Sequence, residues 1–545
     1  MNTSTLMKLS VAGLLAIGAA QPVAAQWGSQ TSAKTIYSKN GEIAQLLTAR
    51  TADGYTYLSW WEWNTEWSPA SSMMLCMQLL DPQGNCMWGE DGIVVDSYPT
   101  KSYTSMNSLI VDKEGNAYVS WADSRSQIDK ILTDEDQRYD NFEPVIYKIN
   151  KDAEFLWGED GLTLDPSKYS MSPILYQAGD NIYASIYGIG SGSYIASYFV
   201  RLNPETGEFM GEPQSMGGQY IASAGNDIIN VYSSGGQTLA MRYNQNLQPV
   251  WSAPSVVAPF VYEGHSNFPY TLKTDYLGGV IVSLERNTSV SKWMPVVNYI
   301  TADGESTFGT AVDVVETEEN NNTYNFICYN PQTESILNVW GISNPTLALG
   351  AQLMDLFGDR EWGENGLFLA TKQATTGYSF APLSVMYTED NLYWILYVDE
   401  TNWQQDTMYL ICVDGEGNVV SEAQRVGAYN QGINNPAIYW EDGSMFIIYY
   451  NWVNNTGEYR IRTLSKTDFY ESPEIPELPG GGSDQPGDNP GEGPGDDPDA
   501  GIESIVAGTG KIKYYSPEGL ELNSPKKGLN IVKGADGEVR KVIIK

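Results

Sequence analysis

The sequence is almost without histidine. His265 is the single histidine in 545 residues. This scarcity excludes metal centres built from several imidazoles, and it leaves a Ser-His-Asp hydrolase no base other than His265. His265 lies in a loop before an apolar run. We expect it to make one ordinary hydrogen bond there, with ligand binding at a loop mouth as the alternative.

Cysteine is also scarce, with four residues: Cys76, Cys86, Cys328 and Cys412. They are too few and too scattered for a disulfide scaffold or a cysteine zinc site. Cys76 and Cys86 flank a predicted turn, so a cross-strand disulfide and two free thiols are both open. The sequence has no glycine-rich phosphate loop. We therefore expect no metal and no cofactor.

Basic residues are few beside acidic ones: 31 Lys and Arg against 67 Asp and Glu, for a net charge of −36. Such a chain repels nucleic acids and anionic membrane surfaces. Its expected partners are neutral or cationic, either a glycan or a protein.

Long apolar runs are missing after the amino end. The longest, Leu9–Ala20, follows Lys8 and precedes the small residues Val23-Ala24-Ala25. The run is too short to cross a bilayer, and its order of basic, apolar and small residues is typical of a signal peptide. We expect residues 1–25 to be removed near Ala25, and the mature protein to be secreted or at the cell surface without a transmembrane segment.

Repeats dominate what is present. Near-copies of one motif begin at Trp88, Trp157 and Trp362, each reading Trp-Gly-Glu-Asp/Asn-Gly followed by Ile or Leu. Short, alternating strands rich in aromatic and β-branched residues precede them, joined by Asp-x-x-Gly turns. We expect the recurring tryptophans to pack between neighbouring repeats.

The repeat unit is about 55 residues long and is read as a four-stranded antiparallel sheet. The predicted fold is all-β: a β-propeller over residues 26–470 with eight blades, or seven as the alternative. The segment around Trp27 is expected to supply a strand that completes the last blade, which would leave only short sheet edges.

The chain changes character after the repeats. Residues 471–500 hold nine acidic and no basic residues among Gly and Pro, which predicts an extended linker. Residues 501–545 form a small basic module with strand-like segments at Lys511–Tyr515, Gly528–Val532 and Val539–Ile544.

One repeat resembles a family of secreted bacterial propeller repeats. The segment Ala117-Tyr-Val-Ser-Trp121-Ala-Asp123-Ser-Arg125 matches that family's strand ending in Trp-x-Asp-x-Arg, and Trp157-Gly158 matches its Trp-Gly closing motif. Leu284-Glu285-Arg286 is a partial copy. The resemblance implies a propeller fold without assigning an activity.

The tail resembles C-terminal modules of Gram-negative surface and secreted proteins, some of which direct export by the type IX route. The matching segments are Tyr514–Gly519, Lys527–Val532 and Lys541–Lys545, although a Pro-Asn-Pro opening is lacking. The resemblance implies contact between residues 501–545 and an export machinery.

Aromatic and charged residues follow the predicted strands, in loops expected to share one face. Exposed rings beside carboxylates suit sugars and protein interfaces alike. The candidate ligand-binding residues are Trp61, Trp63, Trp67, Tyr103, Asp123, Arg125, His265, Trp293, Trp403 and Trp452. For Asp123 and Arg125, we favour an ion pair that fixes the loop.

No pair of carboxylates stands out by its spacing, so no catalytic residue is assigned. We expect a non-enzymatic surface propeller that binds a glycan or protein through its loop face. The alternative is a secreted glycan-active enzyme, a hydrolase or lyase, with acidic residues at the mouth of the propeller.

Overall fold

The computed structural model describes residues 28–29, 32–40, 43–64, 72–98, 100, 107–127, 143–188, 196–216, 220–259, 271–289, 292–316, 322–343, 346–372, 380–388, 391–400, 406–429, 436–441, 444–453, 456–465, 513–515, 521–522, 528–533 and 539–544. These residues form β-strands and one short 3₁₀ turn at Arg125–Gln127, with no α-helix among them. The predicted signal peptide and linker, and Trp27, lie outside these residues.

Seven antiparallel sheets of four strands each follow one another along the chain. The first four are sheet 1, β3 (Ile43–Arg50), β4 (Thr56–Asn64), β5 (Ser72–Leu80) and β6 (Ile93–Asp96); sheet 2, β7 (Ser108–Val111), β8 (Ala117–Asp123), β9 (Glu143–Ile149) and β10 (Leu162–Thr163); sheet 3, β11 (Tyr169–Ala178), β12 (Asn181–Gly188), β13 (Ala196–Leu202) and β14 (Gln214–Ser215); and sheet 4, β15 (Tyr220–Ala224), β16 (Asp227–Ser234), β17 (Gln237–Tyr243) and β18 (Ser255–Ala258).

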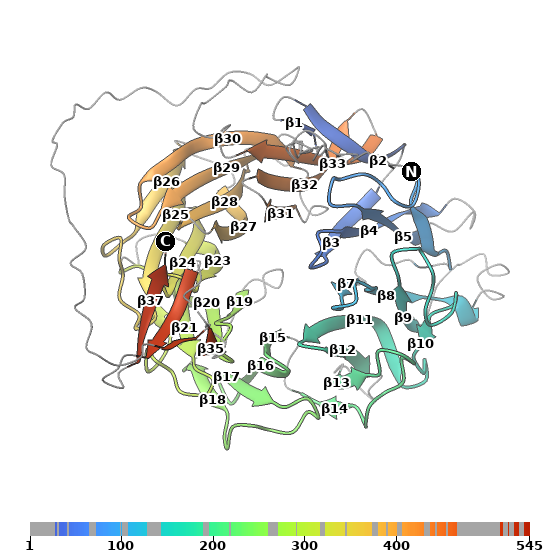
Figure 1. Cartoon of the computed structure of the whole chain (residues 1–545), viewed down its shortest axis with the longest axis horizontal. Coiled ribbons are helices and arrows are strands. Elements are labelled where there is room, and N and C mark those ends of the chain that lie inside the picture. The colour runs from blue at the N-terminus through green and yellow to red at the C-terminus, as the bar shows by residue number, and fades with distance from the viewer. Residues whose placement is uncertain are drawn as a thin grey trace, which may run out of the picture.

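The next three are sheet 5, β19 (Thr271–Thr274), β20 (Val280–Ser289), β21 (Lys292–Ile300) and β22 (Val312–Asp313); sheet 6, β23 (Asn322–Asn330), β24 (Ser335–Ile342), β25 (Leu347–Asp355) and β26 (Leu367–Lys372); and sheet 7, β27 (Phe380–Thr388), β28 (Leu392–Asp399), β29 (Asp406–Asp414) and β30 (Val419–Tyr429). The sheets succeed one another around a common centre in chain order (Figure 1). This is the arrangement of a β-propeller.

One further sheet, the closing sheet, joins the two ends of the repeat region. Its order is β1 (Gly28–Ser29), β2 (Ser32–Asn40), β33 (Thr456–Ser465), β32 (Ser444–Val453) and β31 (Ala437–Glu441). Strand β2 pairs antiparallel with β33, with Tyr37 opposite Tyr459. The amino-terminal strand therefore pairs with the last strand of the repeats, as the sequence predicted.

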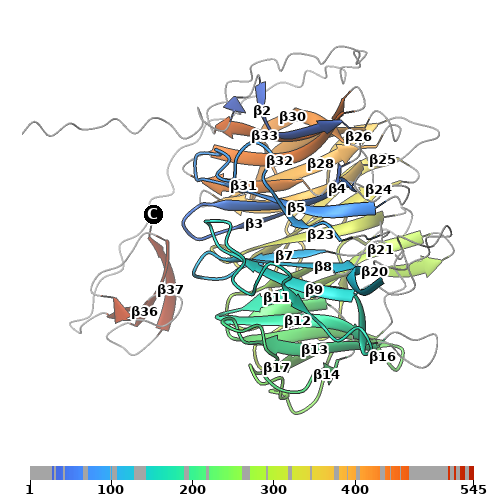
Figure 2. The same ribbon diagram turned by 90° about the vertical axis from the view of Figure 1, so that its right-hand side faces the viewer.

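The hydrophobic core lies between the sheets. Each junction between neighbouring sheets holds its own cluster of buried apolar side chains, including the junction of the closing sheet with sheet 1. Because both faces of a sheet are covered, middle strands are buried almost throughout: Thr56–Asn64 has one half-buried position. Figure 2 shows from the side how strands of successive sheets lie alongside one another.

Tryptophans link four of the sheets to the next one along the chain, as predicted for Trp88, Trp157 and Trp362. The indole N–H groups donate to turn carbonyls of the following sheet: Trp88 to Lys151 at 2.9 Å, Trp157 to Glu205 at 3.2 Å, Trp251 to Ala302 at 2.8 Å and Trp362 to Gly415 at 2.9 Å. The sequence search missed Trp251 because a serine follows it instead of the motif's glycine.

The turn beneath each tryptophan needs a left-handed residue close to the ring. At Gly304, φ is +85° and an added Cβ would lie 2.8 Å from Trp251; at Gly417, φ is +87° and the Cβ would lie 3.2 Å from Trp362. Sheet 3 lacks a tryptophan at this position. The turn of sheet 4 holds Leu247 instead of glycine, and its side chain is 4% exposed in the junction.

The cysteines and the tail complete the description. All four cysteines are free thiols. Cys76 of β5 is paired with Trp60 of β4, and Cys86 is paired with Leu80 in an isolated β-bridge, so Cys76 and Cys86 are not opposite each other. The tail forms a separate antiparallel sheet in the order β35 (Glu521–Leu522), β34 (Lys513–Tyr515), β36 (Gly528–Lys533) and β37 (Val539–Ile544).

Candidate functional site

Two of the predicted ligand-binding tryptophans are buried, and the prediction is wrong for them. Trp61 on β4 is 1% exposed and Trp293 on β21 is 8% exposed. The ring of Trp61 packs edge-on against Trp121 of sheet 2, with centroids 5.1 Å apart. Side chains on both faces of these strands enter a junction, so a tryptophan inside the strand joins the core.

The remaining candidates among the predicted ligand-binding residues provide less information about a binding site. Trp63 is half-buried near the end of β4 and packs against the cluster between sheets 1 and 2. Trp452 lies on β32, and its side chain is outside the part of the chain that the structure describes. Trp67, Tyr103, His265 and Trp403 lie outside the described residues.

Asp123 and Arg125 form the expected ion pair. The guanidinium donates to both carboxylate oxygens, with Nη2–Oδ2 at 2.7 Å. The Asp123 side chain is fully buried and that of Arg125 is 13% exposed. Asp123 therefore offers no free oxygen to a ligand, and its assignment as a ligand-binding residue is corrected to a structural one.

The pair belongs to a larger group between sheets 1 and 2, the Arg125 cluster: Asp96, Asp123, Arg125 and Tyr147. Arg125 also reaches Asp96, 3.3 Å away on the outermost strand of sheet 1, and Tyr147 donates a 2.7 Å hydrogen bond to the same carboxyl. Burial, and next the Asp123 carboxylate, raise the pKa of Asp96 well above its ordinary value. One guanidinium thus faces two buried carboxyls.

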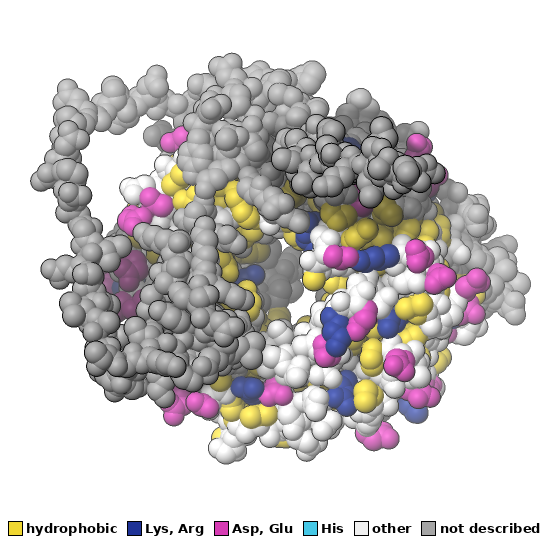
Figure 3. Space-filling view, viewed as in Figure 1, with side chains coloured by type: hydrophobic (Ala, Val, Ile, Leu, Met, Phe, Trp, Pro, Cys, Tyr) yellow, Lys and Arg dark blue, Asp and Glu magenta, His cyan; other side chains and the backbone are white. Residues whose placement is uncertain are grey.

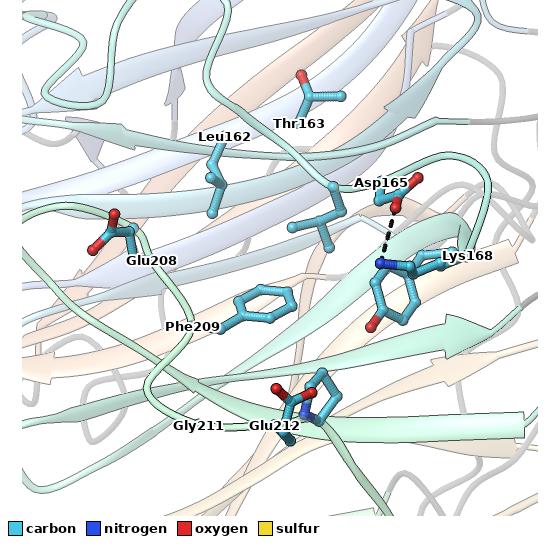
Figure 4. A pocket seen from close by; sticks show the side chains of 12 residues that line it. Leu162, Thr163, Asp165, Lys168, Glu208, Phe209, Gly211 and Glu212 are labelled. Carbon is cyan, nitrogen blue, oxygen red and sulfur yellow. Dashed lines mark ion pairs between the residues drawn. The ribbon is translucent and has the colours of Figure 1, made fainter.

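A cleft opens at the next junction, between sheets 2 and 3 (Figure 4). Its volume is about 490 Å³. It is lined by Leu162, Thr163, Leu164, Asp165, Lys168, Tyr169, Gly207, Glu208, Phe209, Gly211, Glu212 and Pro213. The ring of Phe209 stands between Leu162, Lys168 and Glu212.

The cleft combines ring surfaces with charge. Phe209 and Tyr169 pack edge-on, with centroids 6.4 Å apart. Asp165 and Lys168 form an exposed ion pair at 3.2 Å. Burial is the main cause that raises the pKa of Tyr169, and the charges of Glu212 and Asp165 add to it. The lining residues carry three carboxylates against one ammonium.

A separate acidic group lies at the end of β28. Burial, then Asp406, raises the pKa of Glu400 to about 7. Asp399 pairs with Lys372, which also donates to the Glu400 carbonyl at 3.4 Å. A carboxyl that titrates near neutrality can hold or release a proton at physiological pH.

The sequence search missed the cleft and Glu400. The cleft residues are contributed by two repeats, and only their packing brings them together. A sequence signal for the cleft was present, because the third repeat has Ile186-Tyr-Gly-Ile-Gly190 in place of the Trp-x-Asp-x-Arg ending. Glu400 carried no signal, since its pKa depends on burial.

Within the described ranges, no three His, Cys, Asp or Glu side chains gather as a metal site would require. None of the elements described there is a helix with the length and apolarity to cross a membrane.

No protein-family model and no curated protein matches this chain. Among solved structures, a protein of unknown function from Dyadobacter fermentans overlaps at a TM-score of 0.31 and 13% identity, covering 65% of this chain and 94% of its own. A polysaccharide lyase overlaps at 0.38 and 10%, covering 76% and 89%. The propeller domain of a Pyrococcus furiosus protease overlaps at 0.38 and 8%, covering 72% and 100%. Structural overlap at TM-scores this low carries no information about the activity of this chain.

Proposed function

We propose that this chain is an exported, eight-bladed β-propeller that binds a protein ligand without catalysing a reaction, and that the cleft between sheets 2 and 3 is the contact site. The observation that carries the proposal is one opening of about 490 Å³ that joins ring surfaces to carboxylates. Side chains that anchor a protein partner bind in concave sites of this kind. Its walls are strands and short turns, so it is preformed.

The eight-bladed ring is supported by packing. Each sheet packs on the next through its own apolar cluster, and the closing sheet packs on sheet 1 through residues such as Ile36, Trp60 and Phe446. Lys34 of β2 also donates a 2.7 Å hydrogen bond to the carbonyl of Gly84 in sheet 1. The pairing of β2 with β33 covers an edge of β33 that would otherwise be open to solvent.

Export is supported by the signal-like residues 1–25 and by the tail, which resembles type IX sorting modules. The test is the mass of the mature protein recovered from its producing cells. We expect an amino terminus at or near Gln26 and recovery from the cell surface or medium. A protein that keeps Met1 and stays inside the cell would contradict export.

Ligand binding is tested by panning a displayed peptide library against the full chain. We expect enriched peptides to lose binding to the Phe209→Ala variant, because that ring is central to the cleft. Met210→Ala is the matched control, since Met210 is the next residue, is 46% exposed and does not line the cleft. The proposal fails if no peptide depends on Phe209. A glycan that binds on an array and depends on Phe209 would replace the protein ligand by a sugar.

A second candidate function, a glycan-active enzyme, is favoured by Glu400. A carboxyl with a pKa of about 7 beside Asp399 has the property of a general acid that protonates a leaving oxygen. Release of reducing ends from a panel of polysaccharides would then fall at least 100-fold in Glu400→Gln. Glu416→Gln, an acid of the turn after β29, is the control. Absence of any cleavage by the unaltered protein would exclude this candidate.

A further inference from the structure

This inference rests on the proposed function, and it concerns the chemistry of the ligand. We propose that the cleft binds the guanidinium of an arginine side chain from the protein ligand. That guanidinium would occupy the place that Arg125 fills at the neighbouring junction.

The two junctions are related by the repeat. Ile93 and Leu162 close successive copies of the Trp-Gly motif, so Asp96 and Asp165, three residues later, occupy equivalent positions. Ser120 of β8 and Ser185 of β12 are likewise equivalent within second strands. The repeat position of Asp123 is then Gly188, and that of Arg125 is Gly190. The junction between sheets 2 and 3 therefore keeps one carboxylate, Asp165 from the second repeat, while the third repeat lacks both the arginine and its aspartate partner.

At the junction between sheets 1 and 2, the contacts of Arg125 show how this repeat position binds a guanidinium. Arg125 contacts Asp96 and Asp123, donates to the carbonyl of Asp160 at 2.7 Å and to the Thr163 hydroxyl at 3.2 Å. Its Cζ lies 4.6 Å from the centroid of the Tyr98 ring. Carboxylate, hydroxyl and ring face together match the planar fork of arginine better than the point charge of lysine.

The open junction keeps the same kinds of groups. Hydrogen bonds from Ser167 lower the pKa of Asp165, so its carboxylate is ionised. Phe209 and Tyr169 line the cleft and supply rings, and Glu212 supplies a second carboxylate, whereas the Thr163 hydroxyl is already bonded to Arg125.

Charge favours a cationic occupant. Lys168 neutralises Asp165 across 3.2 Å in an exposed pair, and a pair of this kind contributes little and exchanges readily. Glu208 and Glu212 have no basic partner among the residues that line the cleft. The chain has a net charge of −36, and the face drawn in Figure 3 shows acidic side chains along its edge with basic ones among them. A protein with this excess of acidic residues draws cationic ligands toward it.

The experiment measures binding of three fluorescently labelled, end-capped peptides to the full chain: four arginines, four citrullines and four lysines. Citrulline has nearly the shape of arginine but no charge. We expect the arginine peptide to bind at least tenfold more tightly than either of the others. Asp165→Asn and Glu212→Gln should each weaken it about fivefold, the effect of one exposed charge pair. Glu205→Gln is the matched control, an exposed acid outside the cleft.

Two further variants act in opposite directions. Lys168→Met removes the ammonium that competes for Asp165, and we expect it to tighten arginine binding several-fold. The double variant Gly188→Asp with Gly190→Arg restores the repeat's own arginine, which should fill the cleft and abolish binding.

The outcomes separate this inference from the proposed function. Peptides that depend on Phe209 but bind equally with arginine, citrulline or lysine would overturn the guanidinium assignment alone. Equal weakening by Glu205→Gln would also overturn it, because the binding would then follow overall charge. If no peptide depends on Phe209, the proposed function fails as well.

Discussion

The hydroxyl of Tyr147 donates a 2.7 Å hydrogen bond to the carboxyl of Asp96, and this bond joins the third strand of sheet 2 to the outermost strand of sheet 1. Arg125 approaches the same carboxyl from sheet 2. The junction between the two sheets is therefore polar around the Arg125 cluster, although apolar side chains fill the rest of it.

The raised pKa of Asp96 makes this junction sensitive to pH. A carboxyl whose folded pKa exceeds its unfolded value stabilises the fold below the unfolded pKa, about 4, and that contribution is lost as pH rises through the folded pKa. Asp96→Asn keeps an acceptor for Tyr147 but cannot ionise. We expect the variant to gain stability relative to the unaltered protein as pH rises from 4 to 8, measured by urea unfolding. A difference that stays constant with pH would contradict a raised pKa for Asp96.

Removal of Asp123 should have a larger effect that depends less on pH. Asp123→Ala leaves the largely buried Arg125 guanidinium without its two-point partner, and breaking a buried pair in this way costs about 3–5 kcal/mol. Thermal unfolding of the variant measures the loss. Asp180→Ala is the control, since its pair with Lys113 is exposed and an exposed pair contributes little to stability.

The indole N–H bonds between sheets should contribute measurably. Trp362→Phe keeps a ring in the junction but leaves the Gly415 carbonyl without the 2.9 Å donor. We expect a loss of about 1 kcal/mol in the free energy of unfolding. Phe357→Leu, on a side chain that is 76% exposed, should change it by less than about 0.5 kcal/mol. An unchanged midpoint for Trp362→Phe would show that water replaces the bond.

Among the turns that follow the third strand of a sheet, two place a residue other than glycine in the left-handed region, and the two should respond oppositely to glycine. Ala153 has φ of 63° and Leu247 has φ of 58°. Ala153→Gly relieves strain with little packing lost and should stabilise by about 0.5–1 kcal/mol. Leu247→Gly relieves the same strain but empties a junction that lacks a tryptophan, and should cost about 2–4 kcal/mol net. Unfolding midpoints of the pair test this, and destabilisation by both would mean that Ala153 packs more than its strain costs.

The pairing of β2 with β33 can be tested by truncation. Deletion of residues 26–40 removes β2 and should lower the unfolding temperature and promote self-association, because β33 would become an exposed edge. Deletion of residues 513–545 removes only the tail sheet and should leave the main transition in place. If the first deletion leaves the transition unchanged, β2 does not stabilise the ring.

Local chemistry made much of the fold predictable. Alternating aromatic and β-branched residues predicted strands, and Asp-x-x-Gly turns and Trp-Gly motifs predicted the repeat, because these patterns depend on neighbours within a few residues. The strands predicted at Gly528–Val532 and Val539–Ile544 appear in the tail as β36 and β37. The ion pair of Asp123 with Arg125 was equally local, since a single residue lies between them.

The sequence alone could not determine which side chains of different repeats contact one another. The loop pattern predicted Trp61 and Trp293 as exposed rings that bind a ligand, but only tertiary packing decided that a neighbouring sheet covers them. The cleft depends on Asp165 and Phe209, which belong to different sheets and meet only because those sheets are neighbours. The pKa of Glu400 likewise depends on how much water the folded chain excludes. Residue type and spacing are written in the chain, whereas burial and contact between repeats exist only once the sheets have packed.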